Sequence, residues 1–369
     1  MKTRVALASL MFVTFLPSQA FSAISLSWAD DSDISATQKG TIGQMLASET
    51  EAPPLALSPD EVTLSEKGDG PLEIQILRMD HDAWTPVSGL ELKSPTFENL
   101  SFRTDADGKT SLPGCLNSGG DVNWTAELSN EKFKIARSSH ENYSIHFGTP
   151  CHGTAEIRFK SETNAGQVLG IWQVAQHAHD KLKEAVRMDF WKARLNFIWP
   201  AQADYYMFGE VHLTRGDHWD VIGHEMGHGI YDMAKIGAFG GGQHKIDECY
   251  SPELALSEGW ASFFSAWVTL DLADADAHFE FMVPRRAPIR IENVPLDVCR
   301  GERNEWRVSS FFWDLVDLHA DGETSTESFA RIWNTLLNKN VSKTSAARVQ
   351  LEKAGFDAAL MATVWDLNF

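Results

Sequence analysis

The pentapeptide His224-Glu225-Met226-Gly227-His228 constrains the fold of this chain more than any other stretch. In an α-helix, residues four positions apart lie on one face about a turn apart, so the two imidazoles can hold one metal ion. Glu225 then faces a water molecule on that ion. A catalytic zinc site takes three protein ligands and keeps one position open. The pattern therefore predicts a zinc-binding helix that needs a third ligand from elsewhere in the chain.

Helix boundary signals surround the pentapeptide. Asp217 is predicted to be the N-cap of a helix that runs through about Lys235, and a glycine-rich loop at residues 237–242 ends it. Ser251 is predicted to cap a second helix, with Pro252 at its first position, that runs to about residue 270. The chain thus offers two successive helices around the predicted site.

The third ligand separates two classes of zinc peptidase. The metzincin pattern requires Gly three residues after the second His and another His three residues further on. Those positions are Tyr231 and Ala234, so this pattern is excluded. The second helix carries Glu258 inside an apolar run at residues 255–264. A charge in such a run is costly to bury without a partner, and zinc is a suitable partner, so Glu258 is predicted to be the third ligand.

These two motifs carry a family resemblance. The pentapeptide is followed, thirty residues after His228, by Glu258-Gly-Trp-Ala-Ser-Phe-Phe. This arrangement resembles the gluzincin metallopeptidases (the fungalysin and thermolysin-like clan), particularly the fungalysin-like and related secreted members with an HExxH…EGW pattern. Residues 304–315, with Phe-Phe-Trp-Asp-Leu, are similar to a downstream helix of the same group, predicted here over about 304–319. The resemblance covers roughly residues 200–320 and implies one zinc ion per chain, held by His224, His228 and Glu258, with Glu225 as the general base.

Two positions depart from the family pattern. Thermolysin- and fungalysin-type enzymes carry an Asp four residues after the ligand glutamate, which orients a metal-bound histidine, and this chain has Ser262 there. Another group is then expected to hold the imidazole, or metal binding weakens. Those families also use a downstream histidine to stabilise the oxyanion, and residues 301–314 contain none. The candidates for that role are Arg303, Arg307, His244 and Tyr250.

The N-terminus predicts export. Lys2 and Arg4 precede an apolar run at residues 5–16, and small residues end at Ala20 or Ala23, so residues 1–23 are predicted to be a cleaved signal peptide. The run is too short to span a bilayer, and no later stretch is long enough, so a secreted or periplasmic mature chain without a transmembrane segment is expected. Residues 24–57 are predicted to be a linker or a short pro-segment.

Four cysteines in an oxidising compartment fit two disulfides. The pairs Cys115–Cys151 and Cys249–Cys299 are favoured because each would staple one half of the chain separately.

The two halves of the chain differ in their patterns of apolar and polar residues. Residues 58–160 contain short alternating runs between turn residues, which predict a small antiparallel β-sandwich. Its segments 86–92 and 104–114 resemble a prealbumin-like, carboxypeptidase-regulatory domain, so a surface or protein ligand is a possible partner. Residues 161–369 are predicted to be a mainly helical metallopeptidase domain, with a helix over about 169–186 and a strand at 205–213. The alternation in this strand fits pairing with an extended substrate and fits a core strand equally well. The predicted fold class is therefore α+β.

The net charge limits the classes of molecule that the chain is expected to bind. The chain has 32 Lys and Arg against 51 Asp and Glu, a net charge of −19, so nucleic acid is not expected to bind. The leading hypothesis is a secreted zinc metallopeptidase that hydrolyses peptides or proteins with a zinc-activated water. The alternative is a non-catalytic binding protein with a degenerate gluzincin domain and a partner-binding sandwich.

Overall fold

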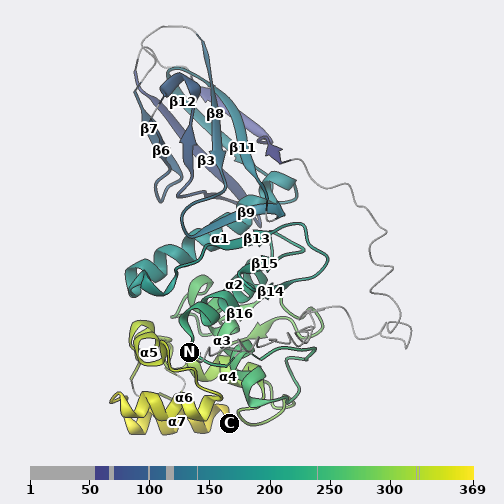
Figure 1. Cartoon of the computed structure of the whole chain (residues 1–369), viewed down its shortest axis with the longest axis vertical. Coiled ribbons are helices and arrows are strands. Elements are labelled where there is room, and N and C mark those ends of the chain that lie inside the picture. The colour runs from purple at the N-terminus through teal and green to yellow at the C-terminus, as the bar shows by residue number, and fades with distance from the viewer. Residues whose placement is uncertain are drawn as a thin grey trace, which may run out of the picture.

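The computed structural model describes residues 55–369, apart from 66–69, 99, 114–119, 139, 239, 321 and 324. The predicted signal peptide at 1–23 and nearly all of the predicted linker at 24–57 lie outside the described residues. The described part has the predicted α+β class, with sheets at one end and helices at the other (Figure 1).

Two sheets form the end of the molecule coloured purple to blue (Figure 1). One has the order β1 (Ala56–Leu57), β11 (Ser144–Pro150), β8 (Asp121–Glu127), β5 (Glu91–Lys93) and β6 (Phe102–Arg103). The other has the order β2 (Glu61–Ser65), β12 (Gly153–Phe159), β3 (Leu72–Asp80) and β4 (Ala83–Pro86), with β7 (Lys109–Leu112) also paired to β3. Burial alternates along β8, β11 and β12, as expected for strands with one face in a core. The pairing is mixed and not purely antiparallel, because β12 runs parallel to β3 and β1 runs parallel to β11.

A third sheet joins the two halves of the chain. Its order is β10 (Glu141–Asn142), β9 (Phe133–Ser138), β13 (Leu195–Ile198), β15 (Glu210–His212) and β14 (Tyr205–Met207). The hairpin of β9 and β10 therefore comes from residues before position 160, and the other three strands come after it. The single strand predicted at 205–213 is wrong: β14 and β15 form an antiparallel hairpin that turns at Phe208 and Gly209, both with positive φ. In this sheet β14 is the edge strand.

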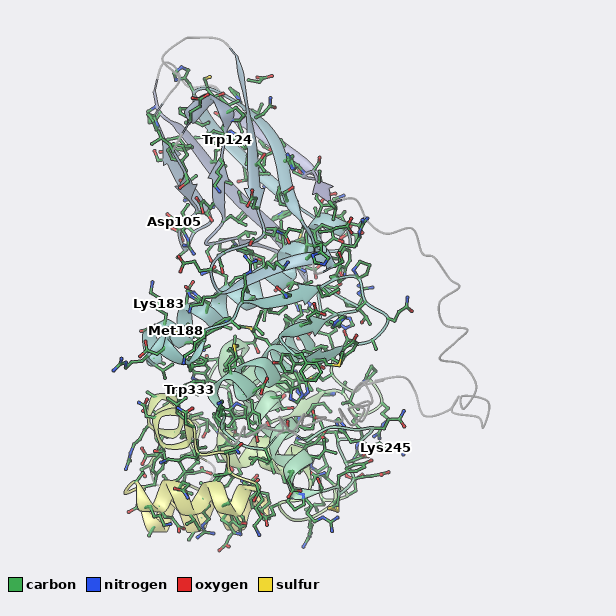
Figure 2. The ribbon with its side chains drawn as sticks, in the orientation of Figure 1. Asp105, Trp124, Lys183, Met188, Lys245 and Trp333 are labelled. Carbon is green, nitrogen blue, oxygen red and sulfur yellow. A yellow bond between two sulfur atoms is a disulfide. The ribbon has the colours of Figure 1, made fainter. Side chains whose placement is uncertain are left out.

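The remaining elements are mainly helical. They are α1 (Asn164–Ala185), η5 (Met188–Phe190), α2 (Trp219–Ala234), α3 (Pro252–Thr269), β16 (His278–Phe279), β17 (Ile289–Arg290), α4 (Glu305–Trp313), α5 (Phe329–Leu336), α6 (Thr344–Lys353) and α7 (Ala358–Asn368), with η4 (Pro95–Phe97) earlier in the chain. The helix predicted near 169–186 is confirmed as α1, and the one predicted over 304–319 is shorter, because α4 ends at Trp313. Figure 2 shows Trp124 within the two-sheet end and Trp333 among the helices.

The two predicted caps differ in outcome. The side chain of Ser251 accepts a hydrogen bond from the backbone N–H of Leu254, so this cap of α3 is confirmed. Asp217 as the cap of α2 is wrong: the cap position is His218, without a side-chain capping bond. The Asp217 carboxylate instead binds the guanidinium of Arg215 at 2.6 and 2.9 Å, which removes it from the helix end.

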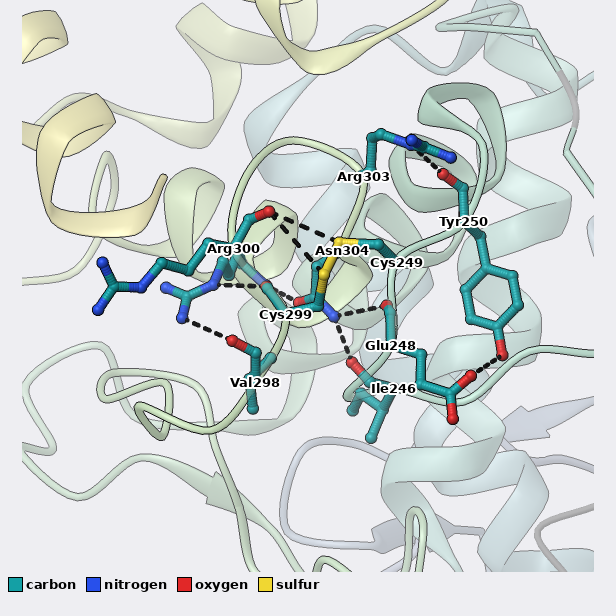
Figure 3. Close-up of a disulfide and its surroundings, with 10 residues drawn as sticks. Ile246, Glu248, Cys249, Tyr250, Val298, Cys299, Arg300, Arg303 and Asn304 are labelled. Carbon is teal, nitrogen blue, oxygen red and sulfur yellow. Dashed lines mark hydrogen bonds between the residues drawn. A yellow bond between two sulfur atoms is a disulfide. The ribbon is translucent and has the colours of Figure 1, made fainter.

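The disulfide Cys249–Cys299 is confirmed (Figure 3). Cys151 is also disulfide-bonded, but its predicted partner Cys115 lies outside the described residues. Among the residues described, no helix combines the length and the apolar character needed to cross a bilayer.

Candidate functional site

Glycines allow α2 and α3 to pack closely. A Cβ atom on Gly227 would lie 2.8 Å from the carbonyl oxygen of Ala261, and one on Gly223 would lie 2.4 Å from the Ser265 hydroxyl. Any larger side chain at these positions would push the helices apart. The two glycines are one helical turn apart, and the residue after Gly223 and the residue after Gly227 are the two histidines of the pentapeptide.

The predicted ligands meet at this helix contact. His224 Nε2 lies 3.1 Å from His228 Nε2, and the two nitrogens lie 3.2 and 3.0 Å from Glu258 Oε2. The three residues are 1, 4 and 1% exposed. Tetrahedral zinc with bonds of about 2.0–2.1 Å separates its ligand atoms by about 3.3 Å. The three donor atoms thus have the chemistry and nearly the spacing that a small divalent cation requires.

Serines on α3 contact the outer nitrogens of both histidines. Ser262 Oγ lies 3.1 Å from His224 Nδ1, and Ser257 Oγ lies 3.5 Å from His228 Nδ1. In place of the aspartate of the family pattern, the Ser262 hydroxyl reaches the imidazole of His224. A partner on Nδ1 fixes the ring orientation and directs Nε2 toward the centre.

The ionisation states also suit metal binding. Burial lowers the pKa of His224 to about 4, so this imidazole is neutral near pH 7. Burial alone would raise the pKa of Glu258, but the neighbouring histidines lower it well below its usual value. Metal ions bind neutral imidazole and ionised carboxylate, and these are the forms that the shifts favour for His224 and Glu258.

Glu225 lies beside this centre with no exposed surface. Within the described part of the chain, neither of its carboxylate oxygens meets the geometry of a hydrogen bond. Burial and the charges of Glu258 and Asp204 raise its pKa well above the usual value, while the nearby backbone of Tyr206 on β14 acts in the opposite direction. A fully buried carboxylate whose pKa is raised by burial and by neighbouring charges is typical of acid–base groups in catalytic sites.

His244, from the loop between α2 and α3, is the candidate that reaches the centre. Its Nε2 lies 3.2 Å from Glu305 Oε2 and 3.7 Å from Glu258 Oε2, and its side chain is 1% exposed. Burial lowers the pKa of His244, but the carboxylates of Glu305 and Glu258 outweigh this effect and raise it to about 9. The next residue, Lys245, lies at the surface (Figure 2), so in this stretch of the loop the side chain of His244 is directed inward and that of its neighbour outward.

The other three oxyanion candidates have structural contacts. Arg303 Nε donates to the carbonyl of Tyr250, and the Tyr250 hydroxyl donates to the Glu248 carboxylate (Figure 3). Arg307 donates to three backbone carbonyls, those of Val298, Cys299 and Asn368.

Sequence reasoning missed Glu305. It occupies the first position of α4, where an acidic residue ordinarily interacts with the helix dipole at the surface. Here it is 5% exposed and faces His244.

No protein-family model and no curated protein sequence matches the chain. The function therefore has to be inferred from the chemistry of the site.

Proposed function

We propose that this protein is a secreted or periplasmic zinc metallopeptidase of the gluzincin type, with one zinc ion per chain. The observation that carries the proposal is the triangle of His224, His228 and Glu258, with sides of 3.0 to 3.2 Å, next to the buried carboxylate of Glu225. The donor set of two imidazoles and one carboxylate is one that catalytic zinc sites use.

The chain's own residues have distinct tasks in this reaction. A zinc ion held by the three ligands would polarise a peptide carbonyl and make a water molecule more acidic. Glu225 takes a proton from the attacking water on a carboxylate oxygen and passes it to the departing amine. Burial raises the pKa of Glu225, so its carboxylate binds a proton more strongly than an exposed carboxylate does.

The edge strand β14 supports a peptide as the substrate. Among the residues that the structure describes, β14 pairs with β15 and forms the edge of its sheet, and the backbone of its central residue, Tyr206, lies near Glu225. An extended peptide can add to such an edge through backbone hydrogen bonds. This would place a peptide bond beside the general base.

Two observations favour the enzyme over a non-catalytic binding protein. The alternative is motivated by two departures from the family pattern, Ser262 and the absence of a histidine in residues 301–314. Ser262 contacts His224, and His244 brings a histidine to the centre from another segment. The disulfide Cys249–Cys299 fits an oxidising compartment and therefore favours export.

Replacing Glu225 with Gln tests the proposal. Glu225→Gln keeps the shape and the ligands, so the variant should still bind one zinc ion, measured by mass spectrometry of the metal. Hydrolysis of a peptide library should fall about 10²–10⁴-fold because the proton acceptor is lost. Glu253→Gln, in the first turn of α3, is the matched control and should keep full activity. A Glu225→Gln variant as active as the native protein, or a native protein without zinc, would refute the proposal.

A further inference from the structure

The carboxylate of Glu258 has a neighbour outside the three-residue centre. His244 lies between it and Glu305, with Nε2 at 3.7 Å from Glu258 Oε2 and 3.2 Å from Glu305 Oε2. The three side chains are 1, 1 and 5% exposed. Two buried carboxylates close together repel each other, so the imidazole between them offsets an otherwise unfavourable contact.

The orientation of the His244 ring is fixed from its other side. Nδ1 lies 3.0 Å from the carbonyl oxygen of Gly242, which can only accept a hydrogen bond. Nδ1 therefore carries a proton and donates it to this carbonyl, and Nε2 is the nitrogen that faces the two carboxylates. A ring held in this way cannot turn away from Glu258 without losing the bond to Gly242.

Close packing of α4 against α3 places Glu305 at the site. A Cβ atom on Gly259 would lie 2.7 Å from the carbonyl oxygen of Glu305 and 2.5 Å from Val308 Cβ. The absence of a side chain at position 259 therefore lets the first turn of α4 begin beside the ligand Glu258.

The same end of α4 also holds the loop that carries His244. Asn304, the N-cap of α4, donates from its side-chain amide to the carbonyls of Ile246 and Glu248 at 2.7 and 2.9 Å (Figure 3). The disulfide Cys249–Cys299 joins the loop to the segment before α4. Glu305 and His244 are thus fixed relative to each other by neighbouring residues.

We propose that Glu305 and His244 are positioning residues for the Glu258 carboxylate, which they hold in the orientation that completes the metal site. The inference rests on the proposed function, because it assigns Glu258 to the metal. Outer residues that orient a ligand typically contribute 10–100-fold to metal affinity, so this is the expected effect of losing either residue.

The test compares four full-length proteins: the native chain, Glu305→Gln, His244→Gln and the control Glu302→Gln. Glu302 lies just before α4, and its carboxylate accepts a hydrogen bond from the backbone N–H of Ser345 in α6. Zinc affinity is measured by competition with a chelator, and the visible spectrum of the cobalt(II)-substituted protein reports the ligand field. Glu305→Gln and His244→Gln should each weaken zinc binding about 10–100-fold and shift the cobalt band, whereas the control should match the native chain.

His244→Gln and the double variant keep the test valid if Glu305→Gln fails to fold. If metal-free Glu305→Gln does not fold, as judged by circular dichroism, His244→Gln carries the test. The variant that lacks both side chains should bind zinc no more weakly than whichever single variant binds it more weakly. The reason is that Glu305 contacts His244 and His244 contacts Glu258, so either substitution breaks the same chain of contacts. Additive losses would overturn the proposal.

The remaining outcomes separate this inference from the function itself. A native chain that binds one zinc ion, together with variants of unchanged affinity and unchanged cobalt spectrum, would overturn the positioning role and leave the proposed function standing. Two metal ions per native chain would make His244 and Glu305 ligands of a second ion and would also overturn it. A native chain that binds no metal would overturn both proposals.

Discussion

The spacing of α2 and α3 gives the sharpest prediction, because one methyl group should disturb it. In Gly227→Ala, the new Cβ would lie 2.8 Å from Ala261 O and 2.9 Å from Ala261 Cα. Comfortable contacts between carbon atoms are about 3.5–4.0 Å, so the two backbones must separate locally by about 0.6–1 Å. Both neighbours are backbone atoms, which cannot rotate aside.

The magnitude follows from two opposing effects. Overpacking of this kind costs about 1–3 kcal/mol, and alanine favours a helix over glycine by about 1 kcal/mol. The metal-free variant should therefore lose up to about 2 kcal/mol of unfolding free energy. Glu258 Oε2 on α3 lies 3.2 and 3.0 Å from the Nε2 atoms of His224 and His228 on α2, and both distances would increase as the helices separate. Zinc affinity should therefore fall at least about 10-fold.

Gly229→Ala, on the same helix, is the matched control. Its Cβ would meet Leu195 Cδ2 at 2.9 Å and Tyr206 Cε2 at 3.2 Å, which are side-chain atoms that can shift. Urea denaturation of the metal-free proteins and a chelator competition for zinc measure the two quantities. This prediction is refuted if Gly227→Ala keeps the native stability and zinc affinity. It is also refuted if Gly229→Ala loses as much stability and zinc affinity as Gly227→Ala.

Three further predictions concern the frame around the centre. The Asp220 carboxylate accepts backbone N–H groups of residues 221 and 280–282, so Asp220→Ala should lose about 3–5 kcal/mol in urea denaturation; a loss below about 1 kcal/mol would contradict this role. Cys249 and Cys299 are 50 residues apart, so replacing both with Ser should lower the unfolding free energy by about 4 kcal/mol, and an unchanged melting temperature would refute this. Burial lowers the pKa of His218 below its usual 6.5, so the unfolded chain takes up this proton first and stability is lost as pH falls below about 6.5. In His218→Gln the stability profile between about pH 7 and 5 should be flatter than in the native chain, and an equal slope would count against it.

That His224, His228 and Glu258 lie together could be predicted from the sequence because the signals are local. Four-residue spacing on a helix places His224 and His228 together, and a lone carboxylate in an apolar helix marks Glu258. Glu305 and His244 have no such signal. One looks like an ordinary first-turn acid and the other follows a glycine-rich loop, and only the packing of α4 brings them together.

The strand assignments that were wrong or missed depend on tertiary contacts. Residues 205–213 alternate as one strand would, yet the chain turns at Phe208, a residue type that seldom adopts positive φ. The parallel pairing of β9 with β13 joins Phe133 to Leu195, across more than sixty residues of sequence. Two half-buried strands of similar composition do not show in their sequences that they are neighbours.

Small residues within the two motifs, beside His224, His228 and Glu258, set how closely the helices pack. Gly227 sets the distance from α2 to α3, and Gly259 sets the distance from α3 to α4. Ser262 faces the outer nitrogen of His224 from the helix that also carries Glu258. The two histidines and the glutamate supply the donor atoms of the proposed centre, whereas the small residues set the distances between the helices that carry them. A helix pair that carried the same two histidines and glutamate with larger residues at these positions would hold its donor atoms too far apart to share one ion.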